Sequence, residues 1–260
     1  MSFKLIHELF LYFSNKPSMA AKKFGHLKES IALLKRQKRC HLFWKTHQDH
    51  CKKLILETLS LVKKFDRILI IGSGPLHEIP IEEISKKFKE VILVDIVHLK
   101  VTKNKYRHLS NLHFVEHDIT ELENDLIKEK KLLNKTPNKF LDEEFDFVIS
   151  ANLLSQLAIH LKKFINKNHI ESDENKIDQF CFDLTKNHVD YLTKFNCIKL
   201  LITDIETYLD YPQKNLREIE TPYINFSLPK EVDSWIWNIA PIPELSNDFS
   251  LQMKVVGIIL

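Results

Sequence analysis

The chain has 260 residues, of which 44% are apolar and 28% charged, enough for one large domain or one domain with an appendage. No apolar run approaches the roughly 18 residues needed to span a bilayer, so we expect no membrane protein. Residues 2–13 are apolar but interrupted by His7 and Glu8, which favours an amphipathic helix over a signal peptide. The four cysteines are scattered, so we expect no disulfide framework and a cytoplasmic location.

The net charge of +3 conceals two oppositely charged segments. Residues 19–53 hold ten Lys or Arg and two acidic residues, whereas residues 204–248 hold nine acidic and three basic residues. The basic segment, centred on residues 35–39, is either a solvated helix face that complements the acidic segment, within one molecule or across a dimer, or an RNA-binding arm. Apart from Phe43 and Trp44 it lacks aromatic residues for stacking on bases, which favours the first interpretation.

Residues 1–65 are expected to form a helical extension. Pro17 and Ser18 separate a first helix from the rest, and Ile55, Leu59 and Val62 follow one another at helical spacing. No strand pattern occurs before residue 66, so these helices should pack on the domain that follows.

Strands and helices alternate from residue 66 onward. Apolar runs predict strands at 68–71, 91–95, 112–116, 145–150 and 198–203, with helices at 80–88, 98–107, 121–133, 153–164 and 176–195. Apolar strands separated by helices are typical of a parallel, doubly wound sheet covered on both faces.

The end of the chain follows a different pattern. Residues 208–229 contain three prolines and are expected to form a loop, whereas 235–240 and 252–260 predict two strands that pair antiparallel. The predicted fold is therefore an α/β domain over residues 66–260. Its doubly wound, mainly parallel seven-stranded sheet ends in a C-terminal antiparallel strand pair, and the helical extension over 1–65 precedes it.

Two of the four glycines, Gly72 and Gly74, directly follow the first predicted strand. Glycine allows a sharp turn and a close approach to a ligand, and a strand followed by Gly-x-Gly opens many nucleotide-binding α/β domains. Asp95 ends the second predicted strand, 21 residues after Gly74. These positions all fall at the carboxyl ends of parallel strands, where open α/β sheets bind ligands.

The motifs and the predicted sheet resemble class I S-adenosylmethionine-dependent methyltransferases over about residues 66–260. The resemblance implies that the glycine loop passes beneath the methionine and ribose of S-adenosylmethionine (SAM), and that Asp95 accepts both ribose hydroxyls. It further implies that residues after the third strand bind adenine and residues after the fourth line the methyl-transfer site. The implied cofactor-binding residues are Gly72, Ser73, Gly74, Pro75, Glu78, Asp95, Ile96, Asp118, Ile119 and Asn152.

The glycine loop departs from the family's acidic-x-Gly-x-Gly-x-Gly pattern, because Ile70 holds the acidic position and Leu76 the third glycine. Glu78 is the candidate to replace the missing carboxylate, and Asp118 either binds adenine or caps the next helix. The loop also resembles the Gly-x-Gly-Pro-x-Gly of flavin and nicotinamide enzymes, with His77 in place of the last glycine. The C-terminal strand pair suits the methyltransferase better.

Candidate catalytic residues at the methyl group are Asn152, Gln156 and Asp204, with His47 or His50 reaching in from the helical extension. Trp44, His47 and His50 are also candidates for a substrate lid. Cys40, Trp44, His47 and Cys51 fall on one helix face, but the bulky Trp44 favours packing over a zinc site, and we predict no bound metal.

The sequence therefore predicts SAM-dependent methyl transfer to an acceptor that it does not identify, a small molecule in preference to RNA. Such an enzyme mainly aligns donor and acceptor, and it needs a base only if the nucleophile is protonated. One alternative is an inactive methyltransferase-like protein that binds RNA through its basic helix, and another is a flavin- or nicotinamide-binding protein. The oligomeric state stays open.

Overall fold

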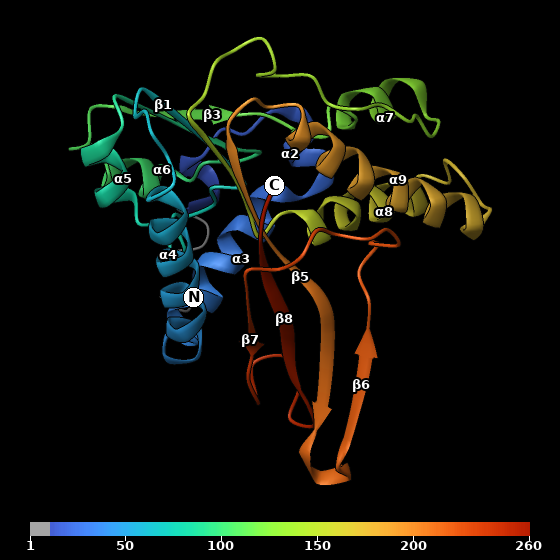
Figure 1. The fold of residues 1–260 in the computed structure, drawn as a ribbon. Coiled ribbons are helices and arrows are strands. Elements are labelled where there is room, and N and C mark those ends of the chain that lie inside the picture. The colour runs from blue at the N-terminus through green and yellow to red at the C-terminus, as the bar shows by residue number, and fades with distance from the viewer. Residues whose placement is uncertain (1–10) are drawn as a thin grey trace.

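Helices cover both faces of one central sheet in the computed structural model, which describes residues 11–260 (Figure 1). The strands of this sheet are β1 (Arg67–Ile71), β2 (Glu90–Asp95), β3 (Leu112–Glu116), β4 (Phe147–Ala151), β5 (Ile198–Tyr211), β6 (Leu216–Glu220), β7 (Asp233–Ala240) and β8 (Ser250–Ile259). The α-helices are α2 (Met19–Phe24), α3 (His26–Arg39), α4 (His41–Leu59), α5 (Ile81–Lys87), α6 (Lys100–Lys105), α7 (Glu123–Glu129), α8 (Leu157–Lys167) and α9 (Glu174–Thr193). Two 3-10 turns are η1 (Leu154–Gln156) and η2 (Pro212–Lys214). The amphipathic helix predicted for residues 2–13 falls largely outside the described residues.

The strand order is β3-β2-β1-β4-β5-β8-β7, with β6 paired to β5. Strands β1 to β5 are parallel to their neighbours within this group, and β8 runs antiparallel between β5 and β7. The predicted fold class, a doubly wound and mainly parallel sheet with a C-terminal antiparallel pair, is confirmed. No helix within residues 11–260 has the length and apolar content to cross a bilayer.

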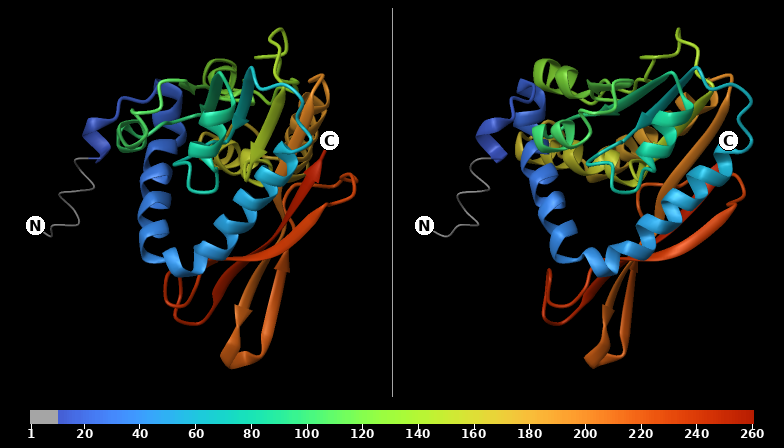
Figure 2. Two further views of the ribbon diagram at one scale, coloured as in Figure 1. Left: turned by 60° about the vertical axis from the view of Figure 1, so that its left-hand side comes forward. Right: turned by 90° about the vertical axis from the view of Figure 1, so that its left-hand side faces the viewer.

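The predicted strand count of seven is wrong, because the described sheet has eight strands. The segment 208–229, predicted as a loop, begins with the end of β5 and contains β6, which pair from Thr207↔Glu220 to Tyr211↔Leu216. After Thr203 acidic residues interrupt the apolar run, so the continuous apolar signal stops there, but β8 continues to pair with β5 as far as Asp210. This antiparallel support extends the strand into a hairpin that projects from the body of the molecule (Figures 1 and 2).

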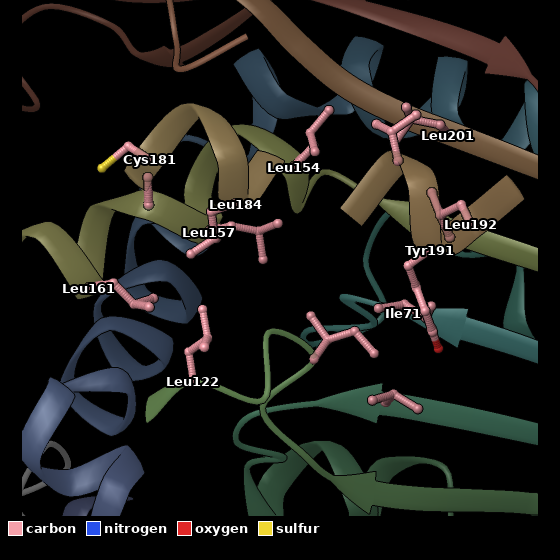
Figure 3. Packing of buried hydrophobic residues seen from close by; sticks show 14 of the residues in the cluster. Ile71, Leu122, Leu154, Leu157, Leu161, Cys181, Leu184, Tyr191, Leu192 and Leu201 are labelled. Carbon is pink, nitrogen blue, oxygen red and sulfur yellow. The ribbon is translucent and has the colours of Figure 1, made fainter. Parts of the chain in front are cut away.

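Alternate residues of each strand enter different cores, as the two-residue period of a strand requires. Leu69 and Ile71 of β1 pack beneath α8 and α9, in the cluster that Figure 3 shows with Leu157, Leu161 and Leu184. The neighbouring Ile68 and Ile70 face the opposite way, towards α4 and α5. Because both faces are buried, the carboxyl edge of the parallel strands is the edge left to build a site.

Helices α3 and α4 meet at Cys40 and form a V beside the sheet (Figure 2). The α4 arm packs on β7, where the Trp44 indole N–H donates to the Ile239 carbonyl at 2.9 Å. The α3 arm places Leu27, Ile31 and Leu34 in a separate small core with residues that follow β2. The extension thus lies over the edge at which β1, β2 and β4 end.

Candidate functional site

A cavity of about 220 Å³ opens at the carboxyl ends of β1, β2 and β4, beneath α3 and beside α8. It gathers all ten residues that the sequence assigned to the cofactor: Gly72, Ser73, Gly74, Pro75, Glu78, Asp95, Ile96, Asp118, Ile119 and Asn152. These residues come from the loops after four different strands, so the parallel sheet is what brings them together.

The glycine turn needs its glycines for backbone reasons. Gly72 has a φ of +74°, and a Cβ there would lie 2.8 Å from the Ala151 carbonyl oxygen, so the turn passes against the end of β4. Gly74 has a φ of +50° but open space around it. Its N–H donates to the Asp95 carboxylate at 2.8 Å, which ties the turn to the end of β2.

Asp95 and Asp118 differ in the hydrogen bonds that their carboxylates accept from the surrounding chain. Asp95 accepts from Gly74 N–H through one oxygen, and from Ile96 N–H at 2.7 Å and Val97 N–H at 3.5 Å through the other. The first oxygen is free to accept another hydrogen bond, and the long contact from Val97 leaves room for one at the second. Asp118 accepts from the backbone and hydroxyl of Thr120 through one oxygen, and from two backbone N–H groups at the start of α7 through the other. The Asp118 side chain therefore caps its own loop and helix, and its acceptor capacity is filled.

Glu78 presents a partly buried carboxylate to the cavity, and it forms no ion pair with a described residue. Burial raises its pKa from 4.5 to about 6, while a hydrogen bond from its own backbone and the charge of Lys52 act in the opposite direction. A carboxylate that lies next to a cavity without a cationic partner is a feature of ligand sites, since the ligand can supply the missing counter-charge.

The cavity wall is acidic. Among the described residues it carries five carboxylates and three histidines but no Lys or Arg. The acidic members are Glu29, Glu78, Asp95, Asp118 and Glu123. Such a wall attracts cations and repels phosphates and carboxylates.

Two tryptophans form part of the cavity wall. Trp44 and Trp237 both line it and meet edge to face, with ring centroids 4.9 Å apart. The Trp237 N–H is buried without a partner among the described residues, as is the Ser73 hydroxyl. Both groups are therefore hydrogen-bond donors that no described residue satisfies.

His47 lies one layer behind this wall and stacks on Trp237, with ring centroids 3.9 Å apart. The Trp235 indole N–H donates to His47 Nδ1 at 3.0 Å, so the proton of the neutral ring is on Nε2. Burial lowers the His47 pKa to about 3, which keeps the ring neutral. Nε2 is 3.3 Å from the Asn152 amide, and the amide satisfies both groups when its oxygen, which otherwise has no partner, faces Nε2.

The candidate catalytic residues divide into two groups. Asn152 and Gln156 line the cavity, whereas His47, His50 and Asp204 do not. Asp204 is buried, and it accepts from the Ser155 hydroxyl at 2.5 Å.

Of the predicted lid, Trp44 alone reaches the wall, and His50 stacks on Trp235 farther out. No group of three or more His, Cys, Asp or Glu within residues 11–260 is arranged to hold a metal.

Several polar wall residues were missed by the sequence analysis, among them His26, Glu29, Glu123 and His160. His160 follows Gln156 by one helical turn, a spacing that the sequence already contained. His26 and Glu123 are 97 residues apart and meet only because α3 crosses the loop after β3. No local pattern could have joined them.

The basic segment is partly neutralised within the molecule. Arg36 and Arg39 of α3 both pair with Glu244 of the acidic segment, with Arg36 Nε at 3.5 Å and Arg39 Nε at 2.9 Å. The arginine bonds hold the Glu244 pKa below its ordinary value. The two segments therefore complement each other at this point, as one of the two interpretations of the sequence predicted.

The strand order, with β8 antiparallel between β5 and β7, is that of a Rossmann-like α/β fold, and the cavity lies at the edge where such folds bind ligands. Among solved structures, the chain is similar to a DhpI-SAM-HEP complex, with 11% identity and a TM-score of 0.43 over 92% of this chain and 99% of that one. It is also similar to the N-methyltransferase NodS from Bradyrhizobium japonicum WM9 with S-adenosylhomocysteine (SAH), with 11% identity and a TM-score of 0.39 over 82% and 87% of the two chains. The 23S rRNA methyltransferase ErmE matches with 11% identity and a TM-score of 0.36 over 79% and 67%.

No family model and no curated protein matches the sequence.

Proposed function

We propose that the chain is a methyltransferase that takes its methyl group from SAM. One observation carries the proposal: a glycine turn and a ribose-type carboxylate, Asp95, meet in a cavity whose described wall has five carboxylates and no Lys or Arg. SAM is a nucleoside that bears two cationic groups, a sulfonium and an ammonium. An acidic nucleoside site suits that combination.

The same cavity disfavours the flavin and nicotinamide alternative. A dinucleotide brings a negatively charged pyrophosphate, which such folds bind at a helix N-terminus directly after the glycine turn. Here residues 75–80 separate the turn from α5, which begins at Ile81. The Gly74 N–H is already bonded to Asp95, so the turn offers its donor to a carboxylate of the protein and not to a phosphate.

The residues present fit SAM group by group. Asp95 keeps acceptor capacity for the two ribose hydroxyls, and Glu78 offers a carboxylate to the ammonium. The unpaired donors of Trp237 and Ser73 suit the carboxylate of the methionine moiety. Since the Asp118 side chain is filled, we expect adenine to be held by apolar contacts, with Ile119 on the wall.

When bound, SAM supplies a methyl group on a positively charged sulfur. The protein's own task is to hold the acceptor in line with that methyl and to keep water out. Asn152 is suited to this positioning, since its amide is fixed from behind by the Trp235–His47 pair. Gln156 adds a second amide on the same wall.

Calorimetry with SAH tests the proposal, with NADH as the comparison ligand. We expect SAH to bind and NADH not to bind. Replacement of Asp95 by Ala removes both ribose acceptors and should weaken SAH binding by about 2 to 4 kcal/mol, or roughly 30- to 1,000-fold. Tight NADH binding, or SAH binding unaffected by Asp95→Ala, would contradict the proposal.

A further inference from the structure

Three side chains on the helical side of the cavity have no task in holding SAM: His26 of α3, Glu123 of α7 and His160 of α8. Glu123 is 1% exposed, and one of its oxygens contacts His26 Nε2 directly. Its other oxygen, Oε2, is buried without a hydrogen-bond partner among the described residues. A buried carboxylate oxygen without a hydrogen-bond donor lowers the stability of the fold, and a ligand that supplies a donor removes this cost.

The neighbouring histidine presents a second acceptor. The His160 and His26 rings lie 4.3 Å apart between centroids, and His160 Nδ1–H donates to the Phe24 carbonyl at 3.1 Å. Burial lowers the His160 pKa, so the ring is neutral and its Nε2 carries a lone pair. Glu123 Oε2 and His160 Nε2 are thus two acceptors that await hydrogen atoms.

The charge of the wall restricts what can supply those hydrogen atoms. A carboxylate or phosphate acceptor would meet five carboxylates and no described Lys or Arg, so anionic substrates are disfavoured. A neutral hydroxyl brings one donor. An ammonium brings several donors together with the positive charge that the wall attracts, and Leu157 and Leu161 offer apolar contacts to the rest of a small molecule.

We propose that the methyl acceptor is a small primary or secondary amine, that Glu123 is the catalytic residue that deprotonates it, and that His26 positions the Glu123 carboxylate. This inference rests on the proposed function. The amine arrives as its ammonium ion and transfers one proton to Glu123 Oε2. Its freed lone pair then forms the N–C bond to the methyl carbon while the C–S bond breaks and its electrons remain on sulfur. The products are a methylated ammonium ion, SAH and a protonated Glu123 that returns its proton to solvent.

The surroundings of Glu123 suit a proton acceptor. Burial raises its pKa, the bond from His26 lowers it, and the nearby Asp118 raises it. The charged and titratable groups that act on Glu123 are His26 from α3 and Asp118 from the loop after β3, and His160 from α8 lies against His26. When Glu123 takes a proton from an ammonium ion, its buried negative charge is neutralised. The cost of burying that charge therefore favours the proton transfer that the step requires.

The first experiment measures SAH formation from SAM with matched probes, namely benzylamine, benzyl alcohol and benzoate, together with putrescine and tyramine. SAH binding to the wild type is measured beforehand by calorimetry, so that failure of the cofactor proposal is seen separately. We expect at least one amine to be methylated, and benzylamine at least 100-fold faster than benzyl alcohol or benzoate. If SAH binds but no amine is methylated, or if the alcohol or acid is preferred, the inference is overturned.

The second experiment compares Glu123→Gln, His26→Gln and His26→Phe, with Glu129→Gln on the exposed end of α7 as the matched control. Glu123→Gln should lower amine turnover at neutral pH by tenfold or more, keep SAH affinity within threefold, and recover by about tenfold per pH unit as the amine loses its own proton. His26→Gln keeps a donor to Glu123 and should retain most activity, whereas His26→Phe should behave like Glu123→Gln. If Glu123→Gln weakens SAH binding as much as turnover, Glu123 holds the cofactor and the inference is wrong. A pH profile parallel to that of the wild type also overturns it.

Discussion

Replacement of Glu78 by Gln tests the idea that an unpaired carboxylate awaits the ammonium of the cofactor. The change keeps the shape of the side chain and removes its charge. A hydrogen bond to a charged group contributes about 1.5 to 3 kcal/mol, so SAH, which retains the ammonium, should bind roughly 10- to 150-fold more weakly. Calorimetry at pH 7.5 gives that ratio, and Glu82→Gln, an exposed change on α5 away from the cavity, is the control.

The pH dependence separates this role from a purely steric one. Because burial raises the Glu78 pKa to about 6, the free carboxylate is ionised above pH 6 and mostly protonated at pH 5. An ammonium ligand needs the ionised form, so wild-type affinity should fall about tenfold between pH 7 and pH 5, whereas Glu78→Gln should stay flat over that range. The reasoning is refuted if the two proteins share one pH profile or bind SAH within twofold of each other at pH 7.5.

Glu78→Gln should stabilise the ligand-free protein, although it weakens ligand binding. A carboxyl whose folded pKa lies above its unfolded value of 4.5 loses stability as the pH rises through the interval from 4.5 to 6. Glu78→Gln should therefore raise the free energy of unfolding above pH 6, by at most about 2 kcal/mol because the group is partly solvated. Urea unfolding at pH 7.5 without ligand measures this effect.

Three further predictions concern the turn, the wall and the core. Gly72→Ala should cost about 2 to 4 kcal/mol of unfolding free energy, because the new Cβ meets the Ala151 carbonyl at positive φ. Gly74→Ala, which has open space around it, should cost about 1 kcal/mol. Equal losses of the two variants in urea unfolding would contradict this reasoning. Trp237→Phe removes the unpaired N–H but keeps an aromatic ring, so SAH affinity should drop about tenfold, and an unchanged affinity in calorimetry would exclude that N–H as a ligand donor. Burial lowers the His188 pKa to about 4, so the unfolded state binds the proton first and stability should fall by about 3 kcal/mol between pH 6.5 and 4; a His188→Gln protein with the same acid dependence would refute it.

The sequence by itself determined the parallel sheet and the edge at which the cavity opens. Apolar runs that alternate with helical segments specify strands buried on both faces, and Gly72, Gly74 and Asp95 sit at strand ends whose spacing is local. Because parallel strands present their carboxyl ends on one edge, assigning the strands already brought these residues together. The same reasoning found Glu78, since it lies in the same loop as the glycines.

The tertiary structure decided everything that depends on contacts between distant segments. The β5–β6 hairpin gains support from the pairing of β5 with β8, which its mixed polar and apolar sequence did not reveal. Whether Asp118 caps a helix or faces a ligand depends on where its two oxygens point, which spacing does not fix. Likewise, His26 meets Glu123 only through the path of α3 across the sheet edge. Local periodicity specifies elements, whereas the pairing of residues far apart follows from how those elements pack.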